Sequence, residues 1–163
     1  MTARGLWLRV GIGTALALAA LVALSPRRPP RRLPPLLAVP AGVVGGVALY
    51  AAAVRMPLAA GASGRPVTVL LARHAFFALV AADEEVIWRR VALGVLLPRG
   101  VLLAVAASSS GFALMHRPRV GLQLVTGGVF GSLYLATGWL AAPIGAHWTY
   151  NELVARARPR VPT

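Results

Sequence analysis

The feature that most constrains this chain is a series of long apolar runs separated by short basic or proline-rich stretches. A helix of about 20 residues crosses the roughly 30 Å hydrocarbon core of a bilayer. Of the 163 residues, 58% are of the hydrophobic types, only 13% are charged, and the mean hydropathy is +0.72, which is too apolar for a soluble domain. The sequence therefore predicts an integral membrane protein. We expect residues 1–163 to form a single all-α, polytopic transmembrane bundle of about five to six helices.

The charge balance indicates lipid contact rather than nucleic-acid binding. Seventeen arginines and no lysine stand against four acidic residues, giving a net charge of +13. The arginines flank apolar runs, where they can reach anionic headgroups, and no interleaved aromatic residues offer a stacking surface for bases. The arginine-only basic composition is typical of a GC-rich bacterial genome, so we expect a bacterial plasma membrane. The absence of cysteine excludes a disulfide framework, a thiolate metal site and a cysteine nucleophile.

The first apolar run, residues 6–25, is long enough to cross a membrane and is followed by the proline-rich segment Arg27 to Pro35. A signal peptide is the alternative, because Ala23 to Ser25 resembles a cleavage site. Four arginines directly beyond that point would hinder translocation, which favours a retained helix. Repeated prolines predict a loop at residues 27–35, and its arginines predict a cytoplasmic location.

The second run, residues 36–54, contains Pro40 and three glycines that are typical of close helix packing. Residues 61–66 predict a turn. Residues 67–98 are helical in character over about 48 Å, which is longer than one perpendicular crossing, so this segment either tilts or breaks. Three further runs occupy residues 101–116, 120–138 and 141–155.

The basic tail carries Arg156, Arg158 and Arg160. The positive-inside rule would place both this tail and the loop at residues 27–35 in the cytoplasm, which requires an even number of crossings between them. Whether residues 67–98 cross once or twice leaves the total at five or six.

Ionisable groups within apolar runs are expensive, on the order of 3 kcal/mol each on insertion scales, and they are therefore candidate functional residues. Three of the four acids are adjacent, at Asp83, Glu84 and Glu85. On a helix Glu85 and Arg89 share a face, whereas Glu84 is turned about 100° away. Glu85 is then held ionised by Arg89, and Glu84 is the candidate general base. The alternative is an interfacial loop in which these charges are merely solvated.

Two further clusters contain histidine. Phe112 precedes His116 by four residues, and His147 precedes Asn151 by four, so each pair shares a helical face. The remaining histidine, His74, is interpreted as a packing or interfacial residue.

The ordered set Glu-Glu-x-x-x-Arg, Phe-x-x-x-His and His-x-x-x-Asn, each on a separate predicted membrane helix, resembles a known family. It is similar to the CPBP intramembrane proteases, also called the CAAX protease or Abi family. That family includes type II CAAX prenyl endopeptidases and lysostaphin resistance protein A-like proteins. The resemblance covers about residues 67–155, and the three motifs match in type, spacing and order.

The resemblance implies an intramembrane endopeptidase, a hydrolase that cleaves a peptide bond of a peptide or membrane-protein substrate. Glu84 would activate the attacking water with help from His116, and Glu85 would pair with Arg89 to hold the site. His147 and Asn151 would stabilise the oxyanion, while Phe112 packs the site. The chain departs from the family at Arg90, where a small residue is usual, which places close helix packing in doubt there.

Two questions stay open at this stage. Glu84, His116 and His147 could supply the two-histidine, one-carboxylate set of a catalytic zinc or other divalent metal, as the family's label metalloprotease suggests, but the same residues fit metal-free chemistry equally well. The alternative functions are a non-catalytic membrane scaffold or bacteriocin self-immunity protein of the same fold, and a small transporter with a proton-relaying glutamate. The oligomeric state is not predicted.

Overall fold

The computed structural model describes residues 3–58, 66–117 and 119–157, and within these ranges the chain is helical without strands. This confirms the predicted all-α class. The six long helices are α1 (Ala3–Leu24), α2 (Pro35–Ala53), α3 (Val67–Glu85), α5 (Val101–Met115), α6 (Val120–Thr137) and α7 (Ala141–Arg156). Three short elements join α3 to α5, namely a π-helix η1 (Val86–Leu93), a turn of helix α4 (Gly94–Leu96) and a 3-10 turn η2 (Leu97–Arg99).

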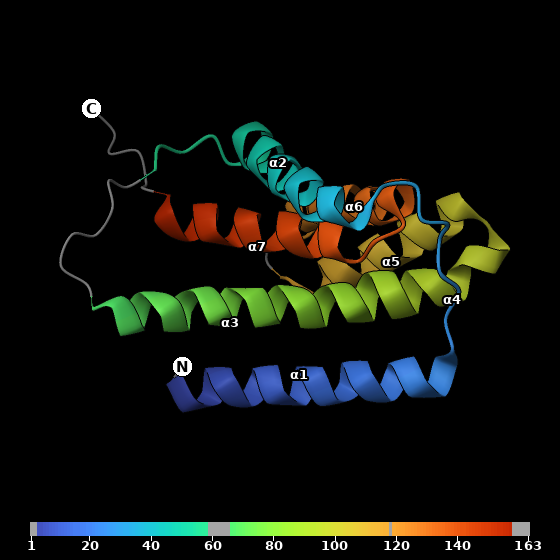
Figure 1. Cartoon of the computed structure of the whole chain (residues 1–163), viewed down its shortest axis with the longest axis horizontal. Coiled ribbons are helices and arrows are strands. Elements are labelled where there is room, and N and C mark those ends of the chain that lie inside the picture. The colour runs from blue at the N-terminus through green and yellow to red at the C-terminus, as the bar shows by residue number, and fades with distance from the viewer. Residues whose placement is uncertain (1–2, 59–65, 118, 158–163) are drawn as a thin grey trace.

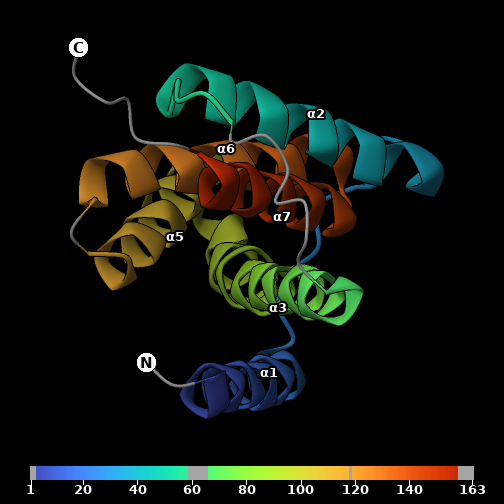
Figure 2. The same ribbon diagram turned by 90° about the vertical axis from the view of Figure 1, so that its left-hand side faces the viewer.

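The long helices run back and forth along one axis, with α7 near the centre (Figures 1 and 2). One side of α7 is covered by α2, and the other side faces α3, beyond which α1 is the outermost helix. The α2–α7 contact is backbone to backbone, because a Cβ at Gly42 or Gly46 would collide with the carbonyl oxygens of Ala142 and Ala146. The glycines of α2 therefore serve the close packing predicted from the sequence.

The segment 67–98 passes along the bundle once. The helix continues from α3 into the π-helix η1 without interruption, and then tightens through α4 and η2 before Gly100, whose φ of +126° ends it. A π-helical stretch inside an α-helix is uncommon and often marks a functional site. Segment 67–98 is longer than one crossing because its last residues form η1, α4 and η2, where the chain reverses direction at one end of the bundle.

The proline-rich segment contains no helix between residues 25 and 34, as predicted. This loop lies across the same end of the bundle. Backbone hydrogen bonds fix it at two points, from Arg27 N to Gly94 O at 3.2 Å and from Arg32 N to Thr137 O at 3.0 Å. Five long helices separate this loop from the end of α7 at Arg156, so the two lie at opposite ends of the bundle (Figure 1). The positive-inside rule requires an even number of crossings between two cytoplasmic segments, whereas five long helices lie between them here. The location of the two basic segments stays a prediction.

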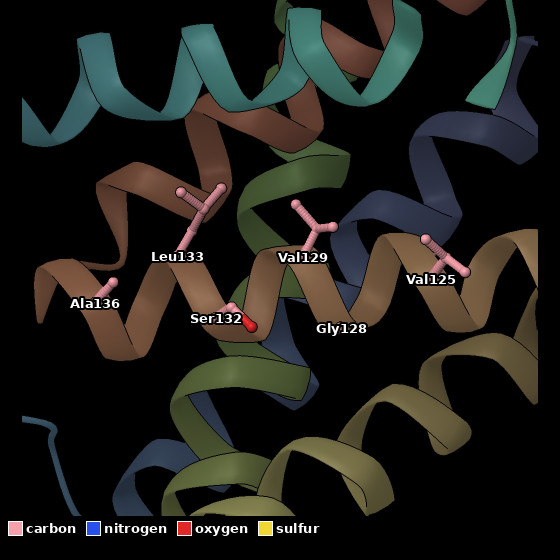
Figure 3. A pocket seen from close by; sticks show the side chains of 6 residues that line it. All are labelled: Val125, Gly128, Val129, Ser132, Leu133 and Ala136. Carbon is pink, nitrogen blue, oxygen red and sulfur yellow. The ribbon is translucent and has the colours of Figure 1, made fainter. Parts of the chain in front are cut away.

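Two of the described helices, α2 and α6, are long and apolar enough to cross a membrane, and residues 10–24 and 101–115 form shorter apolar helices. The outward face of α6 carries an open apolar groove of about 510 Å³ (Figure 3). The groove is lined by Val125, Gly128, Val129, Ser132, Leu133 and Ala136. An apolar outer surface of this kind suits contact with lipid. Residues 61–65 of the predicted turn and the tail arginines 158 and 160 lie outside the described residues.

Candidate active site

A cavity of about 1060 Å³ lies among α1, α3, η1, α5, α6 and α7. Glu84, His116, His147 and Asn151 all line it, although they come from three separate helices. The other two predicted site residues, Glu85 and Arg89, are fully buried behind its wall. The structure thus brings all six residues together in one region.

The buried part of the site is a chain of charged groups. Arg89 Nε donates to Glu85 Oε2 at 2.9 Å, and the other oxygen of Glu85 lies 2.9 Å from His147 Nδ1. Because a carboxylate only accepts hydrogen bonds, His147 Nδ1 carries the proton. The pairing of Glu85 with Arg89 that the spacing predicted is present, and it is extended across the bundle to α7. Glu85 therefore fixes the orientation of the His147 ring.

The second carboxylate, Glu84, faces the cavity between the two histidines. Its Oε2 atom lies 3.2 Å from His116 Nε2 and 3.8 Å from His147 Nε2. The 3.2 Å contact is an ion-pair contact rather than an aligned hydrogen bond, since Oε2 has no hydrogen-bond partner among the described residues. Glu84 and Glu85 consequently have different surroundings, as their angular separation on the helix predicted.

The tautomer of His116 follows from its other nitrogen. His116 Nδ1 lies 2.7 Å from the carbonyl oxygen of Phe112, which only accepts, so Nδ1 carries a proton. The Nε2 atom is then free of a proton in the neutral ring and faces the Glu84 carboxylate. Two lone pairs at 3.2 Å repel one another, whereas a protonated His116 ring forms an ion pair with the Glu84 carboxylate.

Aromatic rings fix both histidines. The Phe112 ring packs on His116 with centroids 4.3 Å apart, and Phe130 stacks on His147 at 4.9 Å with an interplanar angle of 22°. Phe112 also lies 5.3 Å from Arg89 Cζ, and it is 1% exposed. The predicted packing role of Phe112 is confirmed, whereas the stacking role of Phe130 was not predicted.

The departure at Arg90 does not prevent close packing. Arg90 Nη1 donates to the carbonyl oxygen of Pro26 at 2.5 Å. The close approach of η1 to α5 is instead made by Trp88 over Gly111, where an added Cβ would collide with the indole ring. The small residue that the contact between η1 and α5 needs is therefore Gly111 of α5.

A second polar cluster, not predicted from the sequence, joins α3 to α7. Glu152 lies 2.6 Å from Arg73 Nη2 and 2.5 Å from His74 Nδ1, with Arg156 further out at 3.6 Å. His74 therefore contacts Glu152 rather than the cavity, in agreement with its interpretation as a packing residue. The signal in the sequence was the presence of Arg73 and Glu152 in apolar runs, where each charge needs a partner.

The described residues do not support a metal site. No three His, Asp or Glu side chains among them are placed to hold a metal ion together. The candidate set of Glu84, His116 and His147, and with it the metalloprotease assignment, is therefore not supported.

The family model for type II CAAX prenyl endopeptidase Rce1-like proteins matches residues 66–153, which is more than half of the chain. The chain belongs to this Rce1-like family. The family is one of membrane proteases, and the matched segment runs from α3 into α7 and contains all six site residues. No curated protein and no solved structure matches the chain significantly.

Proposed function

We propose that this Rce1-like chain is a membrane endopeptidase that cleaves a peptide bond by glutamate-activated water. The observation that carries the proposal is the position of Glu84 Oε2, which faces the cavity within 3.2 Å of His116 and 3.8 Å of His147. A carboxylate with an unused lone pair in a cavity can accept a proton from water.

In the proposed reaction, Glu84 removes a proton from a cavity water while the water oxygen attacks the peptide carbonyl carbon. The carbonyl oxygen gains the negative charge of the tetrahedral intermediate. When this intermediate collapses, the carbon–nitrogen bond breaks, and the proton taken by Glu84 passes through His116 to the leaving amine. The protein therefore returns to its starting protonation state without a metal or a covalent intermediate.

His147 and Asn151 are proposed to stabilise the oxyanion. The Asn151 side chain lines the cavity and makes no hydrogen bond with another described residue, so its amide is available to a substrate. His147 Nδ1 is committed to Glu85, so Nε2 can donate only when the ring is an imidazolium. The two ring nitrogens of His147 lie 2.9 Å from Glu85 Oε1 and 3.8 Å from Glu84 Oε2. Donors held in place before the reaction are what such stabilisation requires.

The membrane setting is the remaining part of the proposal. We infer six crossings, one for each long helix, because the six helices alternate in direction along one axis (Figure 1). The arginines at both ends would contact anionic headgroups, and the membrane is proposed to be a bacterial plasma membrane. The substrate would be a peptide or a membrane protein.

Cleavage of a mixed peptide library by the purified protein in detergent tests this proposal. Wild type and Glu84→Gln are compared, each with and without a metal chelator. We expect cutting by wild type alone, at a rate that the chelator does not change. Equal cutting by both proteins would contradict the role of Glu84, and chelator-sensitive cutting would contradict the metal-free mechanism.

A further inference from the structure

One wall of the catalytic cavity is formed by α1, which lies outside the segment that the family model matches. Val10 and Gly13 of α1 line the cavity together with Glu84. Among the described elements, α1 packs mainly against α3 and η1, and it is the outermost helix of the bundle (Figures 1 and 2). Its other side exposes large apolar residues, namely Leu8, Ile12, Leu16 and Leu18.

The seam between α1 and α3 contains one polar contact among the described residues. Thr14 Oγ1 lies 2.9 Å from each carboxylate oxygen of Asp83 and 3.0 Å from Val10 O. A hydroxyl has one proton, so this contact is a single hydrogen bond to Asp83 at any moment. The only ring contact across the seam in the described part of the chain is Trp7 edge-on to Phe76, with centroids 5.7 Å apart. Among the described side chains, the seam is therefore held by apolar packing and one hydrogen bond.

A bilayer lowers the cost of opening this seam. Lipid tails are as apolar as the side chains of α1, so no hydrophobic force opposes its separation from α3, and the hydrogen bond to Asp83 is the main specific interaction lost. The far end of α1 is tethered, because Ser25 begins the loop that is bonded to Gly94. The amino-terminal part of α1 can thus swing while its carboxyl end stays fixed.

The cavity is lined by residues at the surface of the bundle as well as by buried ones. Its lining includes Val10 of α1 and Met115 of α5, which is 75% exposed. We propose that the substrate is a bilayer-embedded peptide segment that enters sideways past α1, and that the Thr14–Asp83 hydrogen bond latches α1 as a gate. This inference rests on the proposed protease function, and it names the class of substrate.

A disulfide across the seam tests the gate. A Cβ placed on Gly13 lies 3.8 Å from the Cβ of Asp83, and disulfides have a mean Cβ separation of about 3.8 Å. Because the chain has no cysteine, the pair Gly13→Cys and Asp83→Cys would be the only thiols. The same protein is assayed reduced and oxidised, and Gly13→Cys alone is the control for the oxidant.

Two probes are used with this protein in vesicles of phosphatidylcholine and phosphatidylglycerol. One is a library of peptides with about 20 apolar residues, which span the bilayer, and the other is a library of short soluble peptides. Oxidation is expected to lower cleavage of the spanning peptides by roughly tenfold or more, because the open population is removed, and to leave the soluble peptides unaffected. Unchanged cleavage of the spanning peptides, or equal loss on both libraries, would overturn the gate.

A second measurement needs no cleavage, so it separates failure of the gate from failure of the protease function. Spin labels are attached at Leu8→Cys on α1 and Leu79→Cys on α3, both of which replace exposed residues. Thr14→Val, which removes the hydroxyl at nearly constant volume, is expected to shift the distance distribution towards longer values. A single identical distance with and without Thr14→Val would overturn the gate, whatever the cleavage assays show.

Discussion

His147 and Glu85 are joined across the bundle by a 2.9 Å contact between Nδ1 and Oε1, and Arg89 holds the other oxygen of the same carboxylate. The ring nitrogen opposite this contact faces Glu84 and the cavity. One buried carboxylate thus sets both the orientation and the tautomer of a histidine that borders the cavity. The two adjacent glutamates thus differ in position, because Glu85 is buried behind the cavity wall and Glu84 faces the cavity.

Removing the charge of Arg89 should destabilise the protein. Arg89→Met leaves the Glu85 carboxylate buried without its cation, and breaking a buried pair in this way costs about 3–5 kcal/mol. Thermal unfolding in detergent measures the loss. Replacing both partners, with Glu85→Gln and Arg89→Met, should restore part of the stability without restoring cleavage. A single Arg89→Met variant as stable as wild type would show that the pair does not hold the site.

Asn151→Ala should lower kcat by roughly 10²–10³-fold and change KM little, because an oxyanion donor acts mainly in the transition state. The measurement is steady-state cleavage of a peptide selected from the library. The matched control is Tyr150→Phe, on the same helix, whose hydroxyl makes no hydrogen bond among the described residues. If Asn151→Ala raised KM and left kcat unchanged, its role would be substrate binding instead.

His116 is expected to act in proton transfer, so His116→Ala should reduce kcat by about 10²–10⁴-fold. Its ring is 4.3 Å from Phe112, and loss of that packing is a separate effect. His116→Phe keeps an aromatic ring and removes the nitrogens, which separates the two contributions. Substantial activity in His116→Phe would contradict proton transfer through this residue.

The Glu152 cluster is expected to support stability and the relative position of α3 and α7. Glu152→Gln weakens the contacts with Arg73 and His74 and should lower the unfolding temperature. Arg156→Gln is the matched control, because its contact with Glu152 is 3.6 Å and its side chain is 49% exposed, where an ion pair contributes little. Equal effects of the two variants would contradict this distinction.

The α2–α7 contact predicts a contrast between two glycines. Gly46→Ala should destabilise the protein by about 1–3 kcal/mol or more, because the added methyl group has no space beside α7. Gly128→Ala, on the outer face of α6, meets no atom within 4 Å and should leave stability unchanged or slightly raised. Unfolding in detergent compares them, and a harmless Gly46→Ala would show that α2 packs on α7 differently.

Much of the site could be predicted because its residues have helical spacing. Glu85 and Arg89 share a face at four residues apart, and the separation of Glu84 from them follows from the helix angle. The contact of Glu85 with His147 could not be predicted, since it joins residues 62 positions apart whose helices meet only through tertiary packing. The side of the membrane on which each basic segment lies stays a prediction, because the charge rule asks for an even number of crossings and five long helices lie between the two segments.

The most direct test of the glutamate mechanism is the kcat for a soluble peptide of wild type, Glu84→Gln and Asp83→Asn. Each substitution replaces a carboxylate by an amide of nearly the same size, and both acids line the same cavity. The two variants therefore differ only in which carboxylate is lost. The proposed mechanism predicts a loss of about 10²–10⁴-fold for Glu84→Gln and a rate close to wild type for Asp83→Asn. A Glu84→Gln variant that cleaves at the wild-type rate would contradict it.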